Sequence, residues 1–123
     1  MKGYTDLEQS KKLSEFLPIE SSDMFCADVF DKEKESHSYN FHILSTWGCN
    51  TFEELKDREN KLVHFIPCWS LAALLGVLPS ATLDSSNDHY YRLHCMEKYT
   101  EWYNNPVDAY YKMIIKLHEQ KLL

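Results

Sequence analysis

The sequence predicts a two-layer α+β fold in which about three helices pack on one face of an antiparallel sheet. Segments with helical or alternating apolar spacing follow each other in the order helix, strands, helix, hairpin, helix. A parallel, doubly wound sheet is disfavoured because it needs regular strand–helix alternation and strongly apolar strands. With 123 residues and no repeat or linker, the chain has the size of one domain, so we expect a single globular domain over residues 1–123.

The first helix is predicted from about Thr5 to Leu17. Thr5, followed three residues later by Glu8, has the form of a capping box. Pro18 ends the helix because a helix interior cannot accommodate its ring.

A strand pair is predicted next. Residues 24–30 are apolar and compatible with a helix or a strand, and we favour a strand. Residues 31–38 are charged and lack an apolar anchor, which indicates a solvated loop or a hairpin tip. Residues 39–47 alternate and predict a second strand.

The middle of the chain predicts three short elements. Thr51 opens a second capping-box sequence, which indicates a short helix to Glu59 or merely a turn, and residues 61–66 suit a short strand. Pro67 suits the first position of a helix, and the leucines of 68–78 recur at helical spacing, so a buried helix is expected there. Residues 80–88 are predicted to be a polar connection.

Residues 89–104 predict a hairpin with its turn at Glu97-Lys98, so that Met96 lies opposite Tyr99. One face of this hairpin is expected to join the core and comprises Tyr91, Leu93, Cys95 and Trp102. The other face is amphipathic and comprises Tyr90, Arg92, His94, Tyr99, Glu101 and Tyr103.

A terminal helix is predicted to begin at Asn105. Asn is a favourable cap residue, and Pro106 suits the first turn of a helix. Asp108 complements the positive end of the helix dipole, and an apolar stripe continues to the C-terminus.

Charge and apolar content restrict the partners of this protein. Nineteen acidic and thirteen basic residues give a formal charge of −6, which disfavours binding to a phosphate backbone. No apolar stretch reaches the roughly 20 residues of a membrane span, and the first residues lack the apolar core of a signal peptide. We therefore expect a cytoplasmic protein that has no association with membranes.

The sequence contains no motif for a cofactor, a metal or a catalytic centre. The serine-hydrolase, P-loop and dinucleotide-binding patterns are all absent. The four cysteines, Cys26, Cys49, Cys68 and Cys95, form no CxxC pair. We expect no bound metal or cofactor and no catalytic residues.

Cys68 supports an alternative, a thiol-dependent enzyme. In the first turn of a helix, free amides and the helix dipole would stabilise its thiolate, and His64 could act as a base. The competing interpretation is that Cys68 is a small buried residue, and we favour this one because cysteine is among the most buried residue types.

A partner-binding surface is predicted on the amphipathic face of the hairpin, at Tyr90, Arg92, Tyr99 and Tyr103. Tyrosine and arginine are enriched at the energetic centres of protein interfaces. The alternative is that another part of the chain covers this face, in which case these side chains belong to the core.

Three blocks of the sequence carry a resemblance to a known family. The blocks are GYTDLEQSKKLSEFLPIESSDM, IPCWSLAALLGVLP and NPVDAYYKMIIKLHE, at residues 3–24, 66–79 and 105–119. They resemble a family of small uncharacterised proteins that is abundant in gut anaerobic bacteria and in their phages and prophages. The resemblance implies a phage or mobile-element context and carries no established activity.

These observations favour a non-catalytic protein-interaction module. Its expected partner is another protein or a second copy of the same chain. A thiol-dependent enzyme using Cys68 is one alternative. A nucleic-acid-directed protein is the other, either as a binder or as an acidic decoy, and the dispersed acidic residues give it little support.

Overall fold

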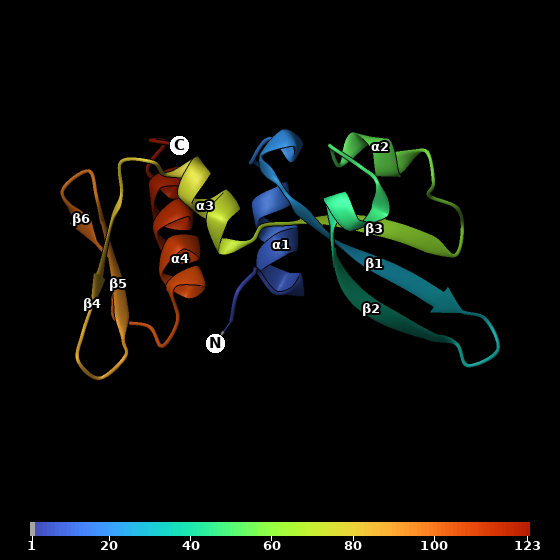
Figure 1. Cartoon of the computed structure of the whole chain (residues 1–123), viewed down its shortest axis with the longest axis horizontal. Coiled ribbons are helices and arrows are strands. Elements are labelled where there is room, and N and C mark those ends of the chain that lie inside the picture. Colours follow the sequence, from blue (N-terminus) through green and yellow to red (C-terminus); the bar gives the residue numbers. More distant parts are fainter. Residues whose placement is uncertain (1) are drawn as a thin grey trace. The chain divides into compact units, whose positions relative to one another are not determined.

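The computed structural model describes residues 2–123, which contain four α-helices and two three-stranded antiparallel sheets (Figure 1). The predicted α+β class is confirmed. The strands are shared between two sheets rather than gathered in one, and the chain divides into two compact units. One unit is Asp6–Trp69, and the other is Ser70–Leu123 together with the N-terminal residues up to Thr5.

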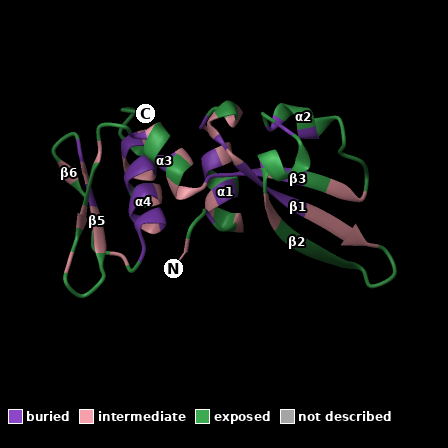
Figure 2. Cartoon of the chain, viewed as in Figure 1, coloured by how far each residue is buried: buried purple, intermediate pink, exposed green. Residues whose placement is uncertain are grey.

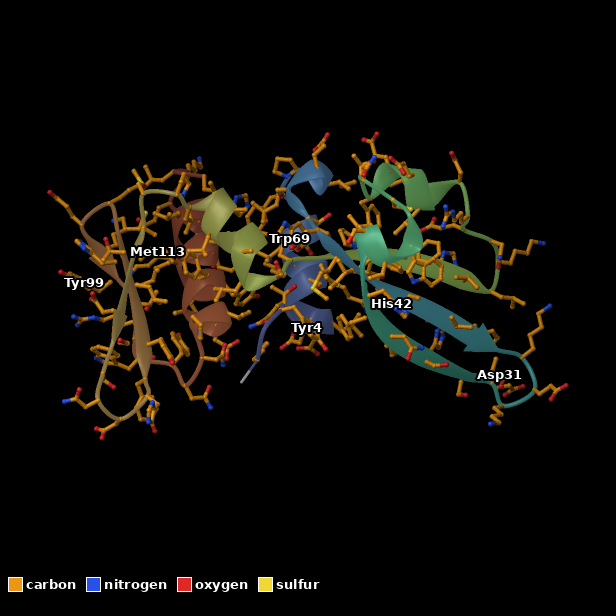
Figure 3. All side chains as sticks on the ribbon, in the orientation of Figure 1. Tyr4, Asp31, His42, Trp69, Tyr99 and Met113 are labelled. Carbon is orange, nitrogen blue, oxygen red and sulfur yellow. The ribbon has the colours of Figure 1, made fainter. Side chains whose placement is uncertain are left out.

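The unit Asp6–Trp69 is built around the sheet order β2-β1-β3. Its elements are α1 (Leu7–Ser14), the 3-10 turn η1 (Ile19–Ser21), β1 (Met24–Asp31), β2 (Ser36–Ile43), the 3-10 turn η2 (Leu44–Trp47), α2 (Glu53–Lys56) and β3 (Val63–Cys68). The strand pair and the charged hairpin tip agree with the sequence prediction, and Figure 3 shows Asp31 at that tip. Both strands extend further toward the tip than predicted.

The cap of α1 differs from the predicted one. Asp6, and not Thr5, is the cap: its carboxylate accepts a hydrogen bond from the amide of Gln9 at 2.8 Å, and the Gln9 side chain accepts one from the Asp6 amide. Thr5 is fully buried. The regular helix ends at Ser14, before the predicted end at Leu17.

The core of this unit lies on both faces of its sheet. Phe25 and Ala27 of β1 pack with Phe65 of β3 on one face, where the segment following β2 covers them. Met24, Cys26 and Cys68 form a second cluster on the opposite face, against which Leu7 of α1 packs. Figure 2 shows the resulting pattern, in which β1 is largely buried toward α1 and β2 is exposed over most of its length.

The predicted helix over residues 68–78 is shorter in the structure. Cys68 is the last residue of β3, and α3 (Leu71–Val77) begins after Ser70, whose hydroxyl accepts from the Ala73 amide. Pro67 lies within the strand instead of starting the helix. It is tolerated there because its ring nitrogen, which has no proton to donate, lies at an edge of the sheet.

The second unit contains α3, β4 (Thr82–Ser85), β5 (Tyr91–Cys95), β6 (Lys98–Tyr99) and α4 (Pro106–Glu119), with β5 at the centre of its sheet. Asn105 caps α4 as predicted, accepting from the Asp108 amide at 2.8 Å. Helix α4 packs against β5 and α3. Strand β4 lies in the segment that was predicted to be a polar connection. Its sequence did not indicate a strand, because Leu83 is its only apolar residue.

Candidate functional site

Strand β5 separates a buried face of its sheet from an outer face. Leu93 and Cys95 are buried on the side that packs against α4. Arg92 and His94 alternate with them and therefore project from the outer side. In Figure 3, Tyr99 lies on the side of the sheet away from α4, whereas Met113 lies between α4 and the sheet.

The turn between β5 and β6 is displaced from the predicted position. Met96 and Glu97 form it, with φ of 52° and 64°, so both central residues have the backbone conformation of a type I′ turn. Tyr99 consequently lies opposite His94, and not opposite Met96 as predicted. The sequence signal for this turn was weak because neither residue is Asn or Gly.

An extra residue then changes which side chains share a face. Tyr91 pairs with Tyr103, although His94 pairs with Tyr99. Two residues of β5 therefore oppose three of the returning chain, which is a β-bulge. Because of it, Trp102 leaves the predicted core position and lies exposed on the outer face, while Tyr103 moves to the face of Tyr91.

Arg92 is held between two aromatic rings at the centre of the outer face. Its guanidinium carbon lies 4.6 Å from the ring centroid of Tyr99 and 4.6 Å from that of Trp102. Its Nε and Nη2 atoms donate to Asp84 on β4 at 3.3 Å. Tyr99 in turn stacks on His94, with centroids 4.2 Å apart and planes 7° from parallel. The Arg92 guanidinium and the three rings thus form one continuous series of contacts, which we call the stack.

Tyr90 extends this surface beyond the stack. It is 47% exposed and, with Trp102, Ser86 and Asp88, lines a surface hollow of about 340 Å³. We call the set Tyr90, Arg92, His94, Tyr99 and Trp102 the aromatic face. Three of the four predicted binding residues belong to it.

Tyr103 is the predicted binding residue that the structure places elsewhere. It borders a second hollow of about 300 Å³, which α4 lines with Lys112, Ile115 and Lys116. Partial burial raises the pKa of its phenol, and the nearby Glu101 and Asp108 carboxylates add to the shift. Trp102 takes its place in the aromatic face, where Asp84 of β4 accepts from Arg92. Sequence alternation could not reveal either residue, because the bulge and β4 were not predicted.

Cys68 lacks the surroundings of a reactive thiol. It is fully buried, and its Sγ donates to the carbonyl of Ile66 at 3.5 Å. Burial raises the pKa of the Cys68 thiol to about 12, so the thiolate is disfavoured at neutral pH. His64 lies four residues away on the same extended strand, about 13 Å along it, which is beyond hydrogen-bond reach.

The charges of the chain are unevenly divided between its two units. Asp6–Trp69 contains thirteen acidic and seven basic side chains and accounts for the whole formal charge of −6. The unit that carries the aromatic face has equal numbers of acidic and basic side chains. Within residues 2–123, no group of three or more His, Cys, Asp or Glu side chains is arranged to hold a metal ion.

None of the helices described in residues 2–123 has the length and apolar character needed to cross a membrane. Comparisons with models of known protein families, with curated proteins and with solved structures find no match.

Proposed function

We propose that this protein is a non-catalytic protein-interaction module that binds a protein partner through the aromatic face. The observation that carries the proposal is the stack in which Arg92 lies between Tyr99 and Trp102 and is also bonded to Asp84. Both rings remain about half exposed. The chain therefore presents two large aromatic side chains and an arginine together on one surface.

These residue types are those that contribute most to binding energy at protein interfaces. Large aromatic rings bury much apolar area and lose little conformational entropy on binding, because they have only two rotatable side-chain bonds. Stacking and the Asp84 contact restrain Arg92 before any partner arrives, which lowers the entropic cost of binding further.

The chemistry of the face indicates what the partner offers. Two of the five guanidinium N–H groups of Arg92 are directed to Asp84, so others can donate to carbonyl or carboxylate oxygens of a partner. Tyr90 and Trp102 border a hollow that suits an apolar side chain. The partner surface is therefore expected to combine an apolar side chain with a neighbouring acceptor oxygen.

A protein partner is favoured over nucleic acid because of the charge distribution. The unit that carries the aromatic face has no net charge, and the remainder of the chain is acidic. Exposed rings can stack on bases, but nucleic-acid binding surfaces combine such rings with a groove of positive charge.

The proposal includes a cellular context. The four cysteines are free thiols, which is the state that a reducing cytoplasm maintains, so we propose that the protein acts there. The resemblance to proteins of gut anaerobes and their phages supports a partner encoded by the host bacterium or by the mobile element.

The test is capture of partners from a lysate of a gut anaerobe that carries a related prophage, followed by titration of the purified partner. Trp102→Ala and Arg92→Ala are expected to weaken binding by about 30-fold, the effect of a typical hot-spot residue. Leu75→Ala is the control, because Leu75 on α3 is comparably exposed and lies outside the aromatic face.

Two results would overturn the proposal. One is a partner that binds wild type, Trp102→Ala and Arg92→Ala equally well. The other is retention of nucleic acid alone, seen as loss of all captured material after nuclease treatment and as binding to a duplex in direct titration.

A further inference from the structure

The sheet of Asp6–Trp69 has two edges, which differ in whether their outward backbone groups are already hydrogen-bonded within the chain. Strand order β2-β1-β3 leaves β2 at one edge and β3 at the other. A sheet edge presents backbone amides and carbonyls that can pair with another strand. An edge can therefore accept another strand only where these amides and carbonyls are not already hydrogen-bonded.

The edge of β3 is closed by the chain itself. The amide of Phe65 donates to the Glu59 carboxylate at 2.9 Å. Asn60 bonds both the amide and the carbonyl of Val63, through its side chain and its own amide. Pro67 has no amide proton to offer. Each of these groups faces away from β1, so a further strand finds no donors here.

Along the edge of β2, comparable protection is missing at His37, Tyr39 and Ile43. The Leu44 amide donates to the Asp23 carbonyl, which sets the alternation of the β1–β2 ladder. It follows that the backbone groups of His37, Tyr39 and Ile43 point away from β1. The hydroxyl of Thr46 donates to the carbonyl of Ile43. In the part of the chain that the structure describes, the amides of His37, Tyr39 and Ile43 have no side-chain acceptor like the Glu59 carboxylate that binds the Phe65 amide.

The usual devices that prevent edge pairing are also missing from β2. Its pairing with β1 is regular over all eight residues and has no bulge. Its sequence, SHSYNFHI, contains no proline and no Lys, Arg, Asp or Glu. Natural edge strands are normally interrupted by such residues, because a regular and uncharged edge invites another strand. Figure 2 shows that β2 is exposed over most of its length.

We propose that β2 pairs antiparallel with β2 of a second copy of this chain, across a two-fold axis. Successive side chains of a strand point to opposite faces of its sheet. When a strand pairs with its own copy across a two-fold axis, the two faces stay continuous only if odd-numbered residues lie opposite odd-numbered ones and even-numbered residues opposite even-numbered ones. The register centred on Asn40 meets this condition and places His37 opposite Ile43 of the second copy. Asn40 then faces its own symmetry mate.

Charge supports a second copy as the occupant. The unit carries −6, yet the charges of the hairpin lie on Asp28, Asp31 and the tip, and none lies on β2. Two copies can therefore approach along this edge without a like charge at close range, and more distant repulsion is screened at physiological salt. The exposed side chains of Tyr39 and Ile43 would lose solvent contact against the same strand of the partner.

The test measures the mass of the full-length protein by sedimentation from about 1 μM to about 1 mM, the range expected for a small interface. With rising protein concentration, the sedimenting mass is expected to increase from that of a monomer to that of a dimer. Tyr39→Pro removes an outward amide and leaves the bonds to β1 in place, so the variant should stay folded and monomeric. Tyr39→Lys, which places a charge on the edge, serves the same purpose if the proline variant fails to fold.

Cysteine cross-linking tests the register. In the predicted dimer the two copies of Asn40 lie about 4.5 Å apart between Cα atoms, so Asn40→Cys should form an intermolecular disulfide on mild oxidation. Ser38→Cys is the matched control: it is equally exposed on the same face, but its mate is about 13 Å away. The native cysteines are buried and should not compete.

A chain that stays monomeric at every concentration would overturn the proposal. So would a dimer whose stability Tyr39→Pro and Tyr39→Lys leave unchanged, or equal cross-linking at positions 38 and 40.

Discussion

The guanidinium of Arg92 lies 4.6 Å above the ring of Trp102, although simple alternation along the hairpin assigns these residues to opposite faces. The β-bulge between the Tyr91–Tyr103 and His94–Tyr99 pairs is what brings them together. The makeup of the aromatic face thus depends on one residue by which the returning chain is longer than its partner strand.

The stack should contribute a measurable coupling to stability. In a double-mutant cycle with Arg92→Ala and Trp102→Ala, we expect a coupling of about 0.5–1 kcal/mol in the free energy of urea unfolding, as for a cation–π contact at an exposed site. Lys56→Ala on α2 is the control, because Lys56 is exposed and belongs to the other unit, and its effect should add to that of Trp102→Ala. A coupling indistinguishable from zero would contradict the contact.

The turn of the β5–β6 hairpin should be improvable. Met96 and Glu97 both have positive φ, which costs an L-residue roughly 1 kcal/mol at each position. Replacing the pair by Asn-Gly should therefore raise the thermal midpoint by several degrees, as expected for about 1 kcal/mol in a small domain. Lys98→Gly, which lies in β6, should lower it, and the opposite order would show that the turn is placed wrongly.

The buried thiol of Cys68 predicts an alkaline pH dependence of stability. Its pKa is raised to about 12 from 9.0 in the unfolded chain, so between these values the unfolded state has released the proton and the native state has kept it. The free energy of unfolding should therefore be unaffected by this group below pH 9 and fall as pH rises from 9 toward 12. The pKa of Cys26 is also raised, chiefly by burial, and acts in the same direction.

Denaturant titrations at pH 8, 9 and 10 measure how steeply the free energy of unfolding falls with pH. Cys68→Ala should make it shallower, because alanine cannot release a proton. An identical slope in the variant would assign the loss of stability to other groups. A thiol reagent should modify Cys68 in native protein far more slowly than in denatured protein.

The protected edge of β3 predicts a conditional interface. Glu59→Ala removes the acceptor for the Phe65 amide, so we expect a loss of about 1 kcal/mol in stability and new concentration-dependent association. Glu59→Gln keeps an acceptor oxygen and should behave nearly like wild type. Light scattering and urea unfolding measure the two effects, and an alanine variant that is stable and monomeric would show that Glu59 does not protect this edge.

Local chemistry predicted those parts of the fold that depend on neighbouring residues. Asn105, Pro106 and Asp108 satisfy the start of α4 within one turn, and the distant Lys2, which pairs with Asp108, leaves this cap in place. The charged tip of the first hairpin is recognisable for the same reason. At α1 the same reasoning chose Thr5 over Asp6, because the burial of Thr5 is not visible in the sequence.

Tertiary structure alone decided how these elements combine. Pro67 is compatible with a helix start and with a sheet edge, and only the pairing of β3 with β1 selects the strand. The placement of Trp102 on the outer face depends on the bulge, which no alternation of residue types encodes. The sequence by itself determined the α+β class, the last helix and an aromatic hairpin. The sharing of strands between two sheets, the makeup of the aromatic face and the difference between the two sheet edges arise from pairing between distant segments, whose hydrogen bonds the linear order of residues does not specify.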